Sequence, residues 1–121
     1  MIMYRIIFYK TQTGKEPVLD FIRDLKKRRD KDARINAAKI NDYIEILSTC
    51  GKAAGEPFIK PVSGEIWELR PIKNRILFAA FDGDCFVLLH CFIKKTNKTP
   101  HSEIEKAKKE FEDFKRRSVN G

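Results

Sequence analysis

The chain has 121 residues, the usual length of one domain, and the sequence predicts a single domain over residues 1–121. Hydrophobic residues make up 42% and aromatic residues 11%, which is enough for a packed core and excludes a disordered tail. Lysine and arginine number 25 against 17 aspartates and glutamates. The resulting net charge of +8 favours an anionic partner, such as nucleic acid, an acidic protein or a membrane surface.

Simple patterns disfavour several classes of protein. No apolar run approaches the ~20 residues of a transmembrane helix, and the first residues lack a signal-peptide pattern. The three cysteines, Cys50, Cys85 and Cys91, form no C-x-x-C pair, and their odd number argues against a disulfide framework. The chain has only two histidines, which excludes a His-rich metal site. We therefore expect a reduced, cytoplasmic protein with no metal, no other cofactor and no membrane contact.

The first half of the chain predicts one strand and two helices. Residues 2–9 are β-branched and aromatic, as in a strand. Apolar residues then recur at helical spacing over residues 17–29. A second helix begins after Asp30 or Asp32, either of which can cap it, and ends at Gly51. A short basic connection joins the two helices, so we expect them to form an antiparallel pair.

The second half predicts three strands and one helix. Strands are expected over residues 65–69, 75–81 and 85–93, and the Asp82-Gly83-Asp84 segment is a hairpin signal. The last strand is almost wholly apolar, which indicates that it is covered on both faces. A final helix starts at Pro100. The order β-α-α-β-β-β-α predicts an α+β fold, a small antiparallel β-sheet with helices packed on one side.

The common catalytic motifs are absent, including the glycine-rich nucleotide loops, G-x-S-x-G and H-E-x-x-H. What stands out instead is the position of the basic residues in the predicted sheet, because they lie in the strands or at their ends. These residues are Lys60, Arg70, Lys73, Arg75, Lys94, Lys95 and Lys98.

The predicted hairpin brings several of these side chains together. Strand alternation puts Glu68 and Arg70 on one face of their strand. The hairpin sets the end of the last strand beside the start of the middle strand, so Arg75 should lie close to Lys94 or Lys95. We therefore expect three strand ends to converge in one cationic patch.

A cationic patch on a rigid sheet is suited to a phosphodiester. Like charges repel one another unless a polyanion compensates them. Arginine binds phosphate bidentately, and lysine binds it as a point charge. Such a cluster also lowers the pKa of a lysine within it, which suits that lysine to transfer protons. RNA supplies its own nucleophile, the 2′-hydroxyl, so ribonuclease chemistry without a metal is possible. The alternative is a set of ordinary solvated charges at strand ends.

A family resemblance covers nearly the whole chain. The residues that carry it are Trp67–Arg70, Asn74–Leu77, Leu88–Thr96 and Thr99–Pro100, with Pro17–Ile22 in the first helix. In these segments the chain resembles the HigB-type, phage-derived branch of the RelE/ParE toxin superfamily. The combination of E-L-R with F-x-K-K-T-x-K-T-P is the more specific part of the likeness. The resemblance also implies the RelE-like fold.

This resemblance implies the toxin of a type II toxin–antitoxin system. The implied activity is that of a metal-independent mRNA endoribonuclease (an mRNA interferase), which acts at the ribosome and inhibits translation and growth. The implied partners are a cognate helix-turn-helix (HigA-like) antitoxin, mRNA and the ribosome. DNA is contacted only indirectly, through the antitoxin complex.

The resemblance also implies roles for individual residues. The catalytic positions of RelE-like toxins correspond to Arg70, Arg75, Lys94 and Lys95. The two arginines would hold and stabilise the phosphate, and one of the two lysines would transfer protons. No tyrosine follows Tyr43, so the chain lacks the C-terminal catalytic tyrosine of some relatives.

Other residues and other functions complete the expectations. Lys60, Lys73 and Lys98 are expected to bind RNA. His90 lies in an apolar strand, so we expect a hydrogen-bonded core histidine rather than a catalytic one. Two other functions compete with RNA cleavage: a non-catalytic RNA- or ribosome-binding module, and a ParE-like gyrase poison. The basic strand ends count against the gyrase poison, which needs no phosphate-cleaving cluster.

Overall fold

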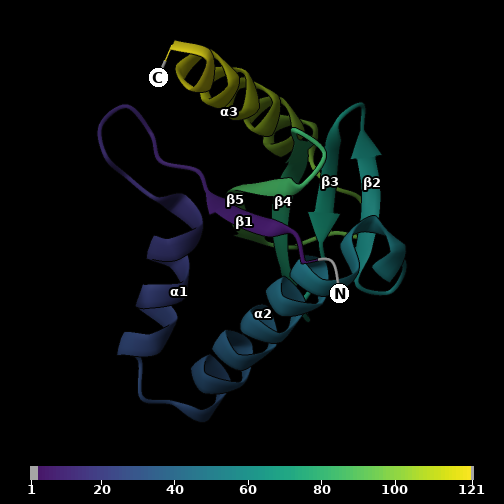
Figure 1. Ribbon diagram of the computed structural model, residues 1–121. Coiled ribbons are helices and arrows are strands. Elements are labelled where there is room, and N and C mark those ends of the chain that lie inside the picture. The colour runs from purple at the N-terminus through teal and green to yellow at the C-terminus, as the bar shows by residue number, and fades with distance from the viewer. Residues whose placement is uncertain (1–2, 121) are drawn as a thin grey trace.

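The computed structural model describes residues 3–120, which contain three α-helices, one short 3₁₀ helix and five strands (Figure 1). In chain order these are β1 (Arg5–Phe8), α1 (Pro17–Lys27), α2 (Lys31–Cys50), η1 (Gly51–Ala54), β2 (Ile59–Ser63), β3 (Ile66–Leu69), β4 (Asn74–Phe81), β5 (Cys85–Ile93) and α3 (His101–Asn120). The α+β class is confirmed. The predicted order β-α-α-β-β-β-α lacks one strand, because β2 has no counterpart in it.

The boundaries of α2 follow from local chemistry. The carboxylate of Asp30 accepts a hydrogen bond from the backbone N–H of Ala33 at 3.1 Å, so Asp30 rather than Asp32 caps the helix. Gly51 ends the helix with a φ of 60°, as predicted. A Cβ added to Gly51 would lie 2.7 Å from the ring of Tyr4. A glycine at this position therefore lets the chain entering β1 pack against the end of α2.

The five strands form one sheet in the order β1-β5-β4-β3-β2. The pairs β2–β3, β3–β4 and β4–β5 are antiparallel, whereas β1 pairs with β5 in parallel. The expected antiparallel sheet therefore needs one correction, at β1. Strand periodicity does not reveal pairing direction. The long connection that a parallel pair requires runs here from β1 through α1, α2 and strands β2 to β4 before it reaches β5. Strand β2 escapes prediction because it lies at an edge and contains Pro61.

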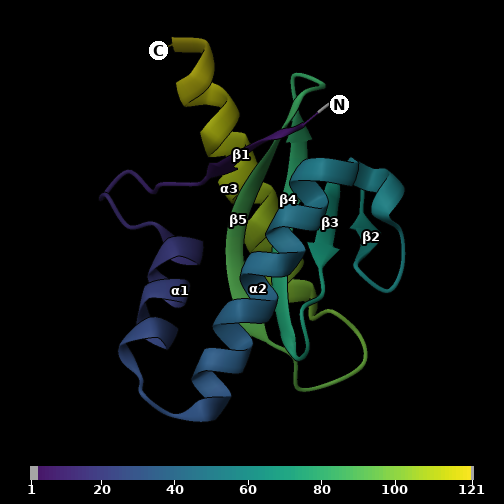
Figure 2. The same ribbon diagram turned by 60° about the horizontal axis from the view of Figure 1, so that its bottom comes forward.

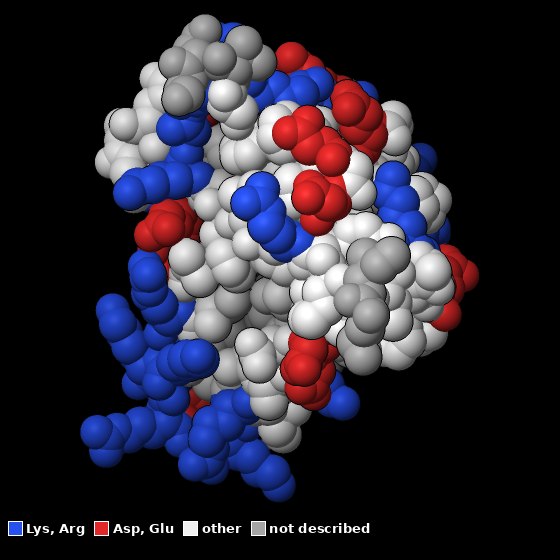
Figure 3. All heavy atoms as spheres, viewed as in Figure 1, with Lys and Arg blue, Asp and Glu red and all other residues white. Residues whose placement is uncertain are grey.

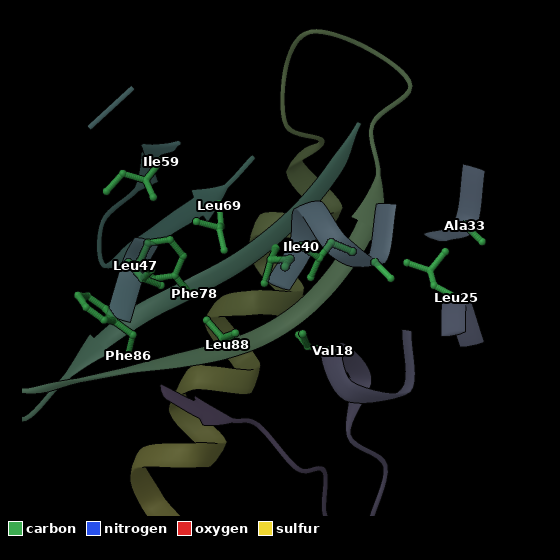
Figure 4. Packing of buried hydrophobic residues seen from close by; sticks show 12 residues of the cluster. Val18, Leu25, Ala33, Ile40, Leu47, Ile59, Leu69, Phe78, Phe86 and Leu88 are labelled. Carbon is green, nitrogen blue, oxygen red and sulfur yellow. The ribbon is translucent and has the colours of Figure 1, made fainter. Parts of the chain in front are cut away.

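Helices cover both faces of the sheet, which corrects the prediction of helices on one side. Figure 2 shows α2 in front of the sheet and α3 behind it. On the first face, Ile40 and Leu47 of α2 belong to one core with Phe78 and Leu88 of the sheet (Figure 4). On the other face, Phe111 of α3 packs against alternate residues of the same strands. The apolar strand β5 is thus covered on both faces, as its sequence predicts.

A polar cluster holds α3 against the segment that follows β1. The hydroxyl of Tyr9 donates to a carboxylate oxygen of Asp113 at 2.6 Å, and Gln12 donates to the other oxygen at 3.0 Å. Arg117 donates to Asp113 at 2.7 Å and also to the backbone carbonyl of Lys10. Burial, with the neighbouring carboxylate, raises the pKa of Tyr9 to about 12. The hydrogen bond from Tyr9, followed by that from Gln12, lowers the pKa of Asp113.

We expect the Tyr9→Phe variant to lose about 2 kcal/mol of unfolding free energy at pH 7, because Asp113 loses a charge-assisted hydrogen bond. The pKa of Tyr9 is higher in the folded state than its usual 10.0, so its contribution is complete below pH 10. That contribution should fall as the pH rises towards about 12. Urea unfolding of both proteins from pH 7 to 12 tests this. If the difference in unfolding free energy between the wild type and Tyr9→Phe stays constant over this pH range, the prediction is wrong.

Candidate functional site

A buried carboxylate, that of Glu68, lies at the centre of the candidate site. Its side chain is only 5% exposed. One oxygen, Oε1, accepts a hydrogen bond from the hydroxyl of Thr99 at 2.7 Å. The other, Oε2, lies 3.4 Å from Nε of Arg70 and 3.9 Å from Nε of Arg75. We call these four residues the Glu68 cluster; it joins the ends of two strands to the loop before α3.

The register of the sheet explains why the two arginines meet. Glu68 of β3 pairs with Leu77 of β4, and Arg75 of β4 pairs with Phe92 of β5. Leu77 belongs to the core under α3, and Arg75 lies two residues before it on the same face. Arg70 follows Glu68 by two residues, so it has the same orientation. Arg70 and Arg75 therefore meet on the face of the sheet that α3 covers.

Arg75 is held rigidly at the start of β4. Its side chain is 8% exposed. Its Nη1 donates to the backbone carbonyls of Ile72 and Asn74, at 3.0 and 2.9 Å. Burial lowers the pKa of Arg75, while Glu68 acts in the opposite direction. Because a guanidinium stays protonated in proteins, Arg75 presents a fixed positive charge.

Arg70 is more accessible, with a side chain that is 26% exposed. Its Nε is buried and has no hydrogen-bond partner among the residues that the structure describes. This N–H group lies 3.4 Å from the carboxylate of Glu68 without good hydrogen-bond geometry. Arg70 is also close enough to Arg75 for its charge to lower the pKa of Arg75. The pair therefore carries hydrogen-bond capacity that the cluster itself does not use.

Lys94 lies near Arg75, where the sequence predicts either Lys94 or Lys95. It lines a small hollow, here called the inner hollow, together with Glu68, Arg75, Phe92 and residues 96–99. The backbone N–H of Lys94 donates to the carbonyl of Lys73 at 2.8 Å, which fixes the end of β5 beside the turn before β4. The ends of β4 and β5 thus bring Arg75 and Lys94 to one hollow, and Arg70, after β3, contacts the Glu68 carboxylate in its wall.

The other predicted basic residues divide into two groups. Lys60 and Lys98 line a second hollow of about 300 Å³, here called the outer hollow, which adjoins the inner one. Lys95 and Lys73 are exposed, and neither lines these hollows. Both lysines follow the end of β5, and they differ in burial, because Lys94 is half-buried whereas Lys95 is exposed. The expected patch therefore includes one of the two neighbouring lysines.

Sequence reasoning did not find the role of Thr99 or the link between Glu68 and Arg75. It recognised that Glu68 and Arg70 share a face, and that Arg75 approaches the end of β5. The contact with Thr99 depends on how the loop over residues 94–100 passes below β3 and β2, which Figure 2 shows. No local sequence pattern specifies the path of a loop of this kind.

His90 is a structural residue, as predicted. It is 3% exposed, and Nδ1 lies 2.6 Å from Glu110 while Nε2 lies 2.9 Å from Glu103. Both ring nitrogens are therefore occupied by carboxylates of α3. His90 joins β5 to α3 and leaves no free nitrogen for catalysis.

A second cationic surface lies at the connection between α1 and α2. Figure 3 shows the lysine and arginine side chains gathered there, at the lower left of the view. The exposed basic residues of this segment are Lys26, Lys27, Arg28, Arg29, Lys31 and Arg34. Arg28 is engaged by Asp30 at 2.9 Å.

Within residues 3–120 no group of three or more His, Cys, Asp or Glu side chains is arranged to hold a metal ion. None of the described helices is long and apolar enough to cross a bilayer.

Residues 20–112 match the family described as phage-derived protein Gp49-like (DUF891), so the chain belongs to this family. The family is associated with RelE-type toxins. Membership is consistent with the toxin of a toxin–antitoxin system, which has an antitoxin as its partner. The matched range contains every residue of the Glu68 cluster and both hollows. A comparison with curated proteins found no significant match.

Replacing Glu68 by alanine should lower the free energy of unfolding by about 1–3 kcal/mol, because Arg75 and Thr99 lose their buried partner. Glu68→Gln keeps an acceptor for Thr99 and should cost less. The matched control is Glu65→Ala, since the Glu65 side chain is 64% exposed. Urea unfolding compares the three variants. Wild-type stability of Glu68→Ala would show that the cluster does not hold these elements together.

Proposed function

We propose that this protein is a metal-independent mRNA endoribonuclease, the toxin of a HigB-type toxin–antitoxin pair. The observation that carries the proposal is that Arg70 and Arg75, from two strand ends, converge on Glu68, while Lys94, from a third, lines the inner hollow with Arg75. Membership in a family associated with RelE-type toxins supports the same conclusion.

The proposed reaction is transesterification within the RNA. The 2′-oxygen attacks the adjacent phosphorus, the bond from phosphorus to the 5′-oxygen breaks, and a 2′,3′-cyclic phosphate forms. The 2′-hydroxyl loses a proton and the departing 5′-oxygen gains one. Hydrolysis of the cyclic product then gives a 3′-phosphate end.

Each cation has a part in this reaction. Arg70 and Arg75 bind the non-bridging oxygens and stabilise the extra negative charge of the pentavalent transition state. The fixed position of Arg75 suits this role, because a preorganised charge needs no rearrangement during the reaction. Lys94, which lines the same hollow, is our candidate for proton transfer.

The ribosome supplies what a small open site lacks. It holds the message in one conformation, which lowers the entropic cost of aligning the 2′-oxygen with the phosphorus. The exposed basic residues between α1 and α2 suit contacts with the ribosomal RNA backbone that carry no base specificity. A helix-turn-helix antitoxin of the HigA type would neutralise the toxin, and only their complex would contact DNA.

An assay of transcript cleavage coupled to translation tests the proposal. Cut transcripts support the endoribonuclease. Intact transcripts, with binding that weakens steeply as salt increases, would instead indicate a non-catalytic RNA- or ribosome-binding module. Accumulation of gyrase–DNA complexes without RNA cleavage would indicate a gyrase poison.

Replacing Arg75 should abolish growth inhibition while the protein stays folded and binds its antitoxin. Arg75→Ala removes the charge, and Arg75→Lys retains it but removes the bidentate geometry. We expect cleavage to fall about 100-fold or more in both variants. Lys39→Ala, an exposed change on α2, is the control and should remain toxic. Full toxicity of Arg75→Ala would show that the site is wrongly assigned.

The two neighbouring lysines should differ in their effect. Lys94→Ala should reduce cleavage about 100-fold, since it removes the cation that shares the inner hollow with Arg75. Lys95→Ala should reduce cleavage only slightly, since its side chain is exposed and outside the hollow. Single-turnover cleavage at constant salt measures both variants. Equal losses would indicate a general electrostatic effect rather than a defined role for Lys94.

A further inference from the structure

The outer hollow has a composition that the phosphate chemistry does not explain. Its volume is about 300 Å³, and much of its wall is apolar, with Val62 from β2 and Ile104 from α3. Both side chains are half-buried, so each keeps an accessible surface. Pro61 is exposed and extends the apolar wall. These apolar surfaces would not contribute to the binding of a phosphate alone.

The outer hollow adjoins the inner hollow. Glu68 and the loop residues 97–99 line both. The hydrogen bond from Thr99 to Glu68, 2.7 Å long, lies in the wall that they share. A phosphate that contacts Arg75 and Lys94 at the surface of the inner hollow therefore lies beside the outer hollow.

The charges around the outer hollow favour an anionic ligand. Lys60 and Lys98 line it and are exposed. Its one acidic residue, Glu68, is engaged by two arginines and Thr99. The volume is at the lower end of the range for small-molecule sites, which suits one nucleoside and is too small for a helix of a partner protein. An apolar wall with cations beside it suits a nucleobase flanked by phosphates.

We propose that the outer hollow binds the nucleobase adjacent to the scissile phosphate, and that Asn97 reads the edge of that base. This proposal rests on the proposed function, because it assigns a base subsite to the same RNA substrate. The base lies against Val62 and Ile104, as unstacked bases of single-stranded RNA lie in apolar pockets. Asn97 lines the hollow, and its amide offers both a donor and an acceptor. Lys60 and Lys98 neutralise the flanking phosphates.

Two variants test the subsite without changing the arginines or Lys94. Asn97→Ala removes the group that reads the base, and Ile104→Trp fills the hollow. The matched control is Ile46→Trp, which enlarges a half-buried isoleucine in a separate surface hollow on α2. Sequencing the new RNA ends shows which base lies beside each cut. Circular dichroism shows whether each variant is folded. If Ile104→Trp does not fold, the Asn97→Ala variant alone still tests the subsite.

We expect Asn97→Ala to weaken the base preference beside the cut about tenfold, while residual cleavage continues. Ile104→Trp should slow cleavage about tenfold or more, and Ile46→Trp should match the wild type. If Asn97→Ala keeps both the wild-type rate and the wild-type base preference, the subsite is wrong. If Ile104→Trp cleaves normally but escapes the antitoxin, the hollow binds the antitoxin and the subsite is also wrong. Absence of cleavage by the wild type would instead overturn the proposed function.

Discussion

The site depends on the interactions of the Glu68 carboxylate with Arg70, Arg75 and Thr99. A buried carboxylate is unstable unless charges and hydrogen bonds compensate it, and here Arg70, Arg75 and Thr99 do so. The reverse also holds, since two guanidinium groups this close would repel one another without Glu68. One carboxylate and two guanidinium groups leave a net charge of +1, to which Lys94 adds another. The cluster is therefore stable without ligand and still attracts an anion.

The fold supplies the rigidity that this arrangement needs. Strands β4 and β5 are packed between two cores, one under α1 and α2 and one under α3. Two sets of hydrogen bonds hold α3 to the rest of the protein. His90 of β5 bonds to Glu103 and Glu110 of α3, and Tyr9 bonds to Asp113 of α3. The site lies at the end of this sheet, where the loop before α3 completes it. A rigid sheet end with a loop above it is a common way to position functional side chains.

The sequence predicts features that depend on neighbouring residues better than features that depend on contacts between distant segments. Local signals gave correct predictions. Asp30 and Gly51 mark the two ends of α2, and the apolar run of β5 indicated a strand covered on both faces. The hairpin signal also predicted that Arg75 lies near Lys94 or Lys95, and the structure places Lys94 there. The parallel pairing of β1, the edge strand β2 and the position of α3 were not predicted, because each depends on how distant segments pack. The contact of Thr99 with Glu68 was missed for the same reason.

In the proposed complex, cations from separate strands hold one RNA phosphate. A crystal structure with an RNA that cannot be cleaved, because the attacking 2′-hydroxyl is methylated, would show this contact. We expect a single phosphate within hydrogen-bond distance of Arg70 and Arg75, with Lys94 beside the 2′-oxygen. RNA bound only along the basic surface between α1 and α2, with no phosphate at the two arginines, would contradict it.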